Sequence, residues 1–410
     1  MLKVDYEVIK KYYNGLDGDN KEFLDKSIKK IIDAKEKGGK VVVATGSGPN
    51  IHEGVTTLIA ELIKKGIIDG VTTSSAVISH EMGGVLDKVK RIDGKKLGSL
   101  VDSENLPRGD IFEFTQMSKE DLEIIKNEMI INEELINKSY GIEGRIIIKA
   151  AGNMAYPMGL RTELLAQDIF VFARTYGLPF ELVAGWGADK RTMIGICAEK
   201  SVPVLVSIPQ LVGGGTVGIC IGDSISISER CMRISQMIND ADVIIESAVV
   251  LTQEIHDGPF ETYTGHGIWP NWLGYNTYRL EDKTIIRIDL DENLKKAWAL
   301  DKSGGMIQEA INKGLPKTKL SKIPFRMEMS AFARLENSIP ITGDIGVIWP
   351  IIAWKVSEAL GISLDFISHP QQTKEGQEMR EYIVESIKPI DKAKIAEKAK
   401  KYTFSIPKAK

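Results

Sequence analysis

The chain has 410 residues and 43% hydrophobic residues, a composition typical of globular proteins rather than of disordered, fibrous or coiled-coil chains. Its 53 basic and 56 acidic residues leave a net charge of −3, which does not favour nucleic acid or anionic membranes as partners. There is no apolar segment typical of a secretory signal or of a membrane span. The three cysteines form no CxxC pair, and their low, odd number indicates a reducing compartment, so we expect a cytoplasmic protein.

The first part of the chain has the pattern of a parallel α/β unit. Residues 1–38 are predicted to be a charged helical extension, because apolar residues recur at helical spacing. An apolar, β-branched strand is expected at 40–45, followed by a glycine loop at 46–48, a helix over 55–63 and a strand at 69–73. This order predicts a parallel sheet with a right-handed crossover.

The rest of the chain continues this alternation after one interruption. Residues 104–144 are predicted to form a helical insertion, whose charged helix runs from a capping box at Ser118 and Asp121 to about Asn137. Further strands are expected at 145–150, 180–184, 203–208, 241–250 and 283–290. A strand–helix junction at 343–350 leads into a helix that ends near Ala359.

Together these elements predict an α/β protein with a doubly wound, mostly parallel sheet of Rossmann-like type. The predicted domains are a helical extension at 1–38, a nucleotide-binding catalytic domain at 39–365 and a helical tail at 366–410. The tail after 376 is rich in Lys and Glu and is predicted to lie on the surface.

Two glycine-rich loops are candidates for ligand binding. The first, Gly46 to Gly54, lies between a strand and a helix start, where backbone N–H groups and the helix dipole favour phosphate. It does not meet the GxGxxG pattern, and a tight turn that needs glycine is the alternative. The second, Gly213 to Gly218, has three consecutive glycines directly after an apolar strand, which permits close approach of a ligand.

Hydroxyl and acidic residues follow other predicted strands. Thr72 to Ser75 lie at the carboxyl end of the second strand and are expected to face the crevice where such sheets bind ligands. His80 and Glu81 follow them and are titratable. Asp289 and Asp344 stand at later strand ends, where an acid can bind ribose hydroxyls. Capping of a helix is the structural alternative for the serines and for both aspartates.

Residues 256–272 gather ionisable and aromatic side chains after a predicted strand, a combination typical of a substrate pocket or lid. Arg191 is a candidate to bind a substrate carboxylate. The candidate general acids and bases are His256, Asp257, Glu261 and His266. An aromatic-rich subunit contact is the alternative for this segment, and its spacing matches no metal-binding signature.

Several motifs occur in the order found in a known family. The segments 40–46, 69–73, 201–204 and 343–350 resemble the NAD-binding domain of deoxyhypusine synthase and, more closely, the C-terminal domain of archaeal NAD-dependent ornithine cyclodeaminases. The resemblance implies a doubly wound domain that binds NAD at the carboxyl ends of its strands. It also implies a homo-oligomer, a dimer or tetramer, with sites near subunit contacts.

The resemblance also implies which residues lie at the cofactor. Carried over position by position, they are Gly46, Ser47, Gly48, Asn50, His52, Thr73, Ser74, Ser75, Gly214, Gly215, Thr216 and Asp344. The segment 330–337 has no lysine, whereas deoxyhypusine synthase uses one there for a covalent imine. We therefore do not expect deoxyhypusine synthase activity.

These patterns predict an NAD-dependent enzyme that acts on a small amine or amino acid through hydride transfer and an imine or carbonyl intermediate. A cyclodeaminase, lyase or transferase reaction fits this description, and no metal is expected. One alternative is an enzyme of the same fold with another phosphate-bearing ligand, such as a sugar phosphate or a flavin. The other is a non-catalytic, nucleotide-binding regulatory subunit.

Overall fold

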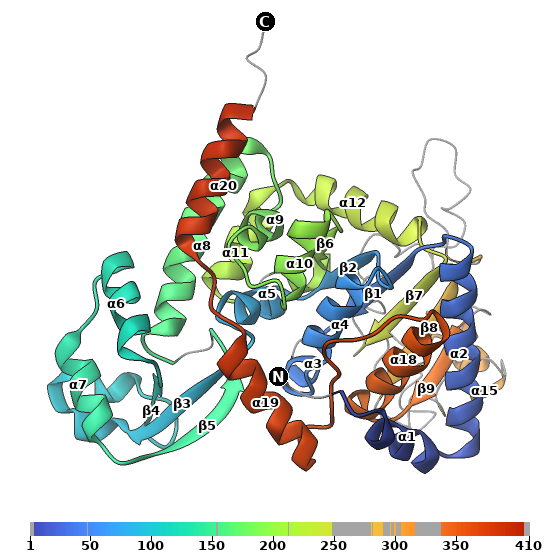
Figure 1. The fold of residues 1–410 in the computed structure, drawn as a ribbon, viewed down its shortest axis with the longest axis horizontal. Coiled ribbons are helices and arrows are strands. Elements are labelled where there is room, and N and C mark those ends of the chain that lie inside the picture. Colours follow the sequence, from blue (N-terminus) through green and yellow to red (C-terminus); the bar gives the residue numbers. More distant parts are fainter. Residues whose placement is uncertain are drawn as a thin grey trace, which may run out of the picture.

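The computed structural model describes residues 4–46, 48–152, 155–211, 213–247, 280, 282–289, 296, 299–300, 305–315 and 338–405 (Figure 1). Within these residues the chain forms a central parallel sheet covered by helices and a smaller antiparallel sheet beside it.

The central sheet has six parallel strands in the described part of the chain, in the order β6–β2–β1–β7–β8–β9. Their bounds are β1 Val41–Thr45, β2 Gly70–Thr73, β6 Val204–Val206, β7 Val243–Ser247, β8 Thr284–Asp289 and β9 Ser338–Thr342. Because the chain builds outward from β1 in one direction and from β7 in the other, the winding reverses between these two strands. The predicted doubly wound α/β fold is confirmed.

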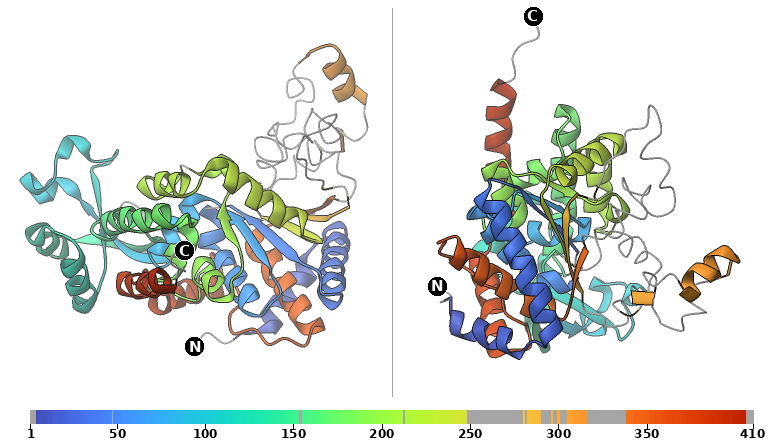
Figure 2. Two further views of the ribbon diagram at one scale, coloured as in Figure 1. Left: turned by 90° about the horizontal axis from the view of Figure 1, so that it is seen from above. Right: turned by 90° about the vertical axis from the view of Figure 1, so that its right-hand side faces the viewer.

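Helices cover both faces of this sheet. They are α1 Tyr6–Gly15, α2 Gly18–Glu36, α3 Gly48–His52, α4 Val55–Lys64, α5 Ser75–Met82, α9 Phe180–Gly185, α10 Met193–Lys200, η3 Ile208–Gln210, α11 Thr216–Ser224, α12 Ile227–Asn239 and α18 Ile345–Ala359. Helix α15 Gly305–Asn312 stands apart from the sheet (Figure 2). On one face α4 packs between α10 and α18. Figure 2 shows α12 on the opposite face of the sheet.

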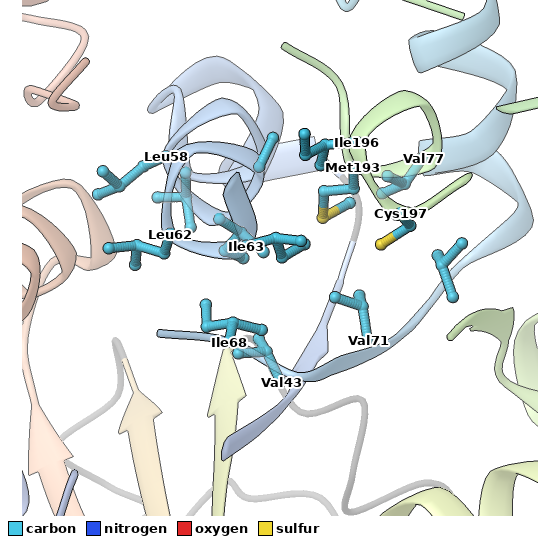
Figure 3. Close-up of a cluster of buried hydrophobic side chains, with 14 of the residues drawn as sticks. Val43, Leu58, Leu62, Ile63, Ile68, Val71, Val77, Met193, Ile196 and Cys197 are labelled. Carbon is cyan, nitrogen blue, oxygen red and sulfur yellow. The ribbon is translucent and has the colours of Figure 1, made fainter. Parts of the chain in front are cut away.

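The core lies between the sheet and the layer that contains α4. Every residue of β1 is buried, as expected for a parallel strand covered on both faces. Figure 3 shows Val43 and Val71 of the sheet facing Ile63 of α4 and Met193 of α10. This packing holds the carboxyl ends of β1 and β2 in fixed positions.

A second, antiparallel sheet has the order β4–β3–β5, with β3 Leu86–Asp93, β4 Ile111–Thr115 and β5 Gly144–Ala150. The helical insertion predicted at 104–144 does contain two helices, but it also contains β4, which was not predicted. The aromatic residue Phe114 of β4 is fully buried, so pairing with β3 and burial decide this segment.

Helical elements accompany this sheet: η1 Gly94–Leu100, η2 Ser103–Asn105, α6 Lys119–Glu128 and α7 Glu133–Gly141. The expected cap is confirmed, since Ser118 Oγ accepts the Asp121 N–H at 3.0 Å. The single helix expected from Ser118 to Asn137 is instead two, because Asn132 caps the start of α7.

The predicted strand at 180–184 was also wrong, because this segment forms α9. Short apolar runs do not distinguish a strand from a buried helix turn. Tertiary contacts decide: the buried Glu181 carboxylate accepts the Val206 N–H at 2.7 Å and forms an ion pair with the buried Arg230. In the helical conformation, the Glu181 side chain contacts both Val206 and Arg230.

The carboxyl-terminal part consists of α19 Lys374–Ser386 and α20 Lys392–Ser405. Helix α19 packs against β3 and β5 and buries Met379 and Ile383. Helix α20 packs beside α8 (Met158–Tyr176), where Tyr402 contacts the rings of Phe172 and Tyr176. The tail is thus packed onto the body of the protein along one side of each helix.

Among the described residues, we find no helix with the length and apolar character needed to cross a membrane.

A buried carboxylate joins α5 to α10. Glu81 is 1% exposed, and its two oxygens accept the Met193 and Ile194 N–H groups at 2.9 Å each. These are free donors at the start of α10, which Thr192 also caps through Gly195 N–H. Burial raises the pKa of Glu81 from 4.5 to about 7.

Glu81→Ala should lower the free energy of unfolding by about 2–4 kcal/mol, because two buried N–H groups lose their acceptor. Since the pKa of Glu81 is higher in the folded protein than in the unfolded chain, its contribution to stability is largest below pH 4.5 and falls as the pH rises toward 7. The cost of the substitution should therefore be larger at pH 5 than at pH 7.5. Urea unfolding at both pH values measures it, with the exposed Glu199→Ala on α10 as the control. A cost equal to that of Glu199→Ala would contradict this role.

Candidate functional site

The strand ends at the reversal point are held by a buried hydrogen-bond network. The hydroxyl of Ser247, the last residue of β7, donates to Asn50 Oδ1 at 2.6 Å and accepts from Trp349 Nε1 at 3.0 Å. Gly46 N–H donates to the Ser247 carbonyl oxygen at 3.0 Å. The β1–α3 connection is therefore fixed against β7 where doubly wound sheets bind ligands.

Polar atoms without partners gather at this edge of the sheet. Thr45 at the end of β1, Thr73 at the end of β2 and Ser207 after β6 each bury a hydroxyl with no hydrogen-bond partner among the described residues. The Asn50 side-chain nitrogen is in the same state. Such groups cost free energy unless a ligand or water pairs with them.

The first glycine loop leaves room at the start of α3. A Cβ atom built on Gly48 would meet no atom within 4 Å. The φ of +20° at Gly48 favours glycine at this position, and the missing side chain leaves the space in front of α3 open. Open space and unpaired polar atoms together fit a ligand rich in hydroxyl and phosphate oxygens, such as a dinucleotide.

The second glycine loop, residues 213–215, contacts α5 and α8. A Cβ on Gly214 would lie 2.9 Å from the Ser75 carbonyl oxygen, and one on Gly215 would lie 2.7 Å from Glu163 Oε1. Gly215 has φ +62°, which also favours glycine. Glu163 Oε2 accepts the Thr216 hydroxyl at 3.1 Å, so a carboxylate already lies at the start of α11.

A pocket of about 520 Å³ lies between this loop, α5 and the start of α8. Its α5 wall consists of Ala76, Ser79 and His80, which share one helix face. The remaining lining residues are Gly152, Ala155, Tyr156, Gly159, Leu160, Glu163, Gly213, Gly214 and Gly215. The volume suits a small-molecule ligand. Tyr156 is engaged elsewhere, because its hydroxyl accepts the Asn132 N–H at 2.8 Å.

His80 is positioned as a proton acceptor in this pocket. Its Nδ1 bonds to the Ala151 carbonyl oxygen, and since a carbonyl only accepts, Nδ1 carries the proton in the neutral ring. Nε2 has no hydrogen-bond partner among the described residues. Burial lowers the pKa of His80; the hydrogen bond to Ala151 acts against this shift, and the positive charge of Lys149 acts with it.

His52 is half-buried at the end of α3, in an electropositive environment. Burial lowers its pKa, and the positive charges of Arg380 and Lys149 act in the same direction. Arg380 donates to the Ile148 carbonyl oxygen at 2.6 Å, and Lys149 pairs with Glu113 at 2.5 Å. His52 is therefore expected to be neutral at pH 7.

The structure gives several predicted site residues a structural task. Ser74 caps α5 by accepting the Val77 N–H at 3.3 Å, and Ser75 donates to the Gln210 carbonyl oxygen at 2.8 Å. Asp344 caps α18 by accepting the Gly346 N–H at 2.8 Å. These hydrogen bonds hold the crevice wall in place. The contacts of these residues with a cofactor stay predictions.

Two other predicted site residues, Asp289 and Arg191, do not line the pocket. Asp289 ends β8, two strands away from β1. Arg191 is exposed and forms a bidentate pair with Asp189, at 2.9 and 2.6 Å, and it does not line the pocket. The following predicted residues lie outside the described part of the chain: Ser47, His256, Asp257, Glu261 and His266. No cluster of metal-ligating side chains occurs among the residues that the structure describes.

Glu163, Thr45 and Ser207 were not predicted from the sequence, and His80 was given no specific role. The signal for His80 was present, because small residues at 76 and 79 share its helix face directly after a strand end. No local signal marks Glu163, which reaches the pocket from a distant helix.

The comparisons with known proteins leave the family open. No family model matches the chain, and no curated protein matches it. Among solved structures, AgrE with ornithine and NAD+ has a TM-score of 0.38 at 10% sequence identity. The match covers 88% of this chain and 34% of the AgrE chain. ArgZ, an arginine dihydrolase of cyanobacteria, has a TM-score of 0.38 at 12% sequence identity. The match covers 82% of this chain and 31% of the ArgZ chain.

A LOR/SDH protein from Methanococcus maripaludis S2 has a TM-score of 0.36 at 11% identity, over 88% of this chain and 71% of its own. The chain spans about a third of the length of AgrE and ArgZ. These values are too low to transfer an activity.

Gly214→Ala should lower the free energy of unfolding by about 1–3 kcal/mol, because the new Cβ meets the backbone of Ser75. Gly213→Ala is the matched control, since its Cβ would meet only the Ser75 hydroxyl at 3.6 Å. Urea unfolding of both variants measures the difference. Equal stability of the two would show that the loop does not lie against α5 in solution.

Proposed function

We propose that this protein is an NAD-dependent enzyme that acts on a small amine or amino acid. One observation carries the proposal: unpaired polar atoms at the carboxyl ends of β1, β2 and β6 stand beside a pocket that contains a histidine and a carboxylate. The first group suits a dinucleotide, and the second suits a small polar substrate.

The residues that would hold the dinucleotide come from three strand ends. The open space at Gly48, at the start of α3, suits a pyrophosphate. Thr45, Thr73 and Ser207 have hydroxyls able to pair with ribose or phosphate oxygens. When bound, NAD supplies the acceptor for a hydride, while the protein supplies orientation and proton transfer.

Glu163 already occupies the start of α11, so the second glycine loop is the weaker phosphate site. This loop forms instead a wall of the substrate pocket, where its lack of side chains leaves space. In this proposal the two glycine loops serve different ligands.

The remaining functional predictions made from the sequence are part of this proposal. Arg191 remains a proposed partner of a substrate carboxylate, after release from Asp189. His256, Asp257, Glu261 and His266 remain proposed acids or bases. A homo-oligomer, a cytoplasmic location and the reaction type remain proposals of the same kind.

Thr73→Val should weaken NAD binding about 3- to 10-fold, because it removes one hydroxyl and keeps the side-chain volume. It should leave folding stability unchanged or slightly higher, since this buried hydroxyl has no protein partner among the described residues. Calorimetric titration with NAD and thermal unfolding measure the two effects.

Thr56→Val on α4 is the matched control for this test, because its buried hydroxyl is also unpaired among the described residues but belongs to a helix rather than to a strand end. Absence of NAD binding by the parent protein would refute the cofactor. If a flavin or a sugar phosphate bound instead, with the same response to Thr73→Val, the alternative ligand would replace NAD.

A further inference from the structure

We propose that the pocket between α5, α8 and residues 213–215 binds the ammonium end of the substrate. Glu163 pairs with the positive charge, and His80 Nε2 accepts a proton from the nitrogen. This inference rests on the proposed function, because it specifies the substrate class of the same enzyme as a primary or secondary amine.

Glu163 carries the first part of the argument. It lines the pocket, is exposed and has no cationic partner among the described residues. Other acids of this region are paired, as in Asp168 with Lys392 at 2.7 Å and Glu128 with Arg161 at 2.5 Å. The Thr216 hydroxyl donates to one Glu163 oxygen and fixes the carboxylate, which leaves acceptor positions for a ligand cation.

The second part is the orientation of His80. The bond from Nδ1–H to the Ala151 carbonyl oxygen fixes the ring and its tautomer, so the lone pair is on Nε2. His80 and Glu163 both line the pocket, one on α5 and the other on α8. A carboxylate that binds an ammonium and a neutral imidazole that accepts its proton are the two groups that amine chemistry needs.

The rest of the pocket wall supports a small, partly apolar amine. Ala76, Ala155 and Leu160 supply apolar surface, and the loop glycines add no side chains. Among the described residues, no Lys or Arg side chain lines the pocket, so none of them competes for Glu163 or attracts an acidic ligand end there. The lining thus favours a cation over an anion.

The implied chemistry balances with the nicotinamide dinucleotide as oxidant. One ammonium N–H bond breaks and its proton moves to His80 Nε2, which leaves a neutral amine. The adjacent C–H bond then breaks, its hydride passes to the dinucleotide, and a C=N bond forms to give an iminium ion. The substrate loses two electrons, the dinucleotide gains them, and the proton leaves His80 for water. Positive charge on Lys149 favours this release.

The first experiment measures ligand binding and does not depend on activity. n-Butylammonium and its neutral analogue n-butanol are titrated into the full-length protein at pH 7.5 and followed by NMR. We expect n-butylammonium to bind at least 10-fold more tightly than n-butanol, and Glu163→Gln to remove this preference. Asp168→Asn, one turn further along α8, removes the same charge outside the pocket and should leave the preference unchanged. Equal binding of both probes, or an unchanged preference in Glu163→Gln, would overturn the proposal.

A second experiment tests His80 through its ring nitrogens. Nitrogen-15 NMR of the labelled protein should show a neutral ring with the proton on Nδ1, and n-butylammonium should shift the Nε2 resonance. His80→Gln identifies the signals. A proton on Nε2, or no shift on addition of n-butylammonium, would overturn the role of His80.

NAD titrations on the same samples separate the two proposals. If NAD binds and n-butylammonium shows no preference for the pocket, the present inference fails and the cofactor assignment stands. If n-butylammonium binds as expected and NAD does not bind, the proposed function fails together with the hydride step.

Discussion

The fixed position of Ser247 is the constraint on which the ligand-binding edge depends. Its hydroxyl and backbone join the end of β7 to α3, to α18 and to the end of β1. Asn50, Trp349 and Ser247 are all fully buried, so water does not compete for the hydrogen bonds between them. Without these hydrogen bonds, the reversal point between β1 and β7 would still exist, but the loop after β1 would not be held at one place.

Helix α5 shows how a helical spacing divides two adjacent ionisable residues. Successive side chains on a helix point about 100° apart, so His80 and Glu81 serve different surroundings. Glu81 points into the core and caps α10, whereas His80 faces the pocket. The buried carboxylate holds α10 and α5 together, and thereby fixes the helix that carries the proposed base.

The sequence predicts the central sheet well, because buried parallel strands are apolar throughout and alternate with helices. Residues 41–45 and 243–247 are such strands. It fails at 180–184, where the contacts of Glu181 with Val206 and Arg230 select a helix. It fails again within 104–144, where pairing with β3 produces β4. Both errors come from interactions between residues distant in the chain, which a local pattern does not contain.

The candidate site follows the same division. Thr73, at the end of a strand, is identified by the strand pattern, whereas Thr45 and Ser207 were not singled out from the sequence. The pocket is not identified by that pattern, because His80 and Glu163 meet only through the packing of α5 and α8 against the glycine loop. Position in the sequence indicates where a crevice lies, while the side chains that complete a pocket depend on the packing of distant helices.

The two glycine loops show that a shared composition does not mean a shared task. At the first, a missing side chain leaves space in front of a helix start that has polar neighbours without partners. At the second, the missing side chains permit contact with Ser75 and Glu163, and the helix start already faces a carboxylate. A helix start stabilises one negative charge well, and a second anion beside it would be repelled. In the function proposed here, a phosphate therefore binds at the first loop, and the second loop is left for a ligand that is itself positive.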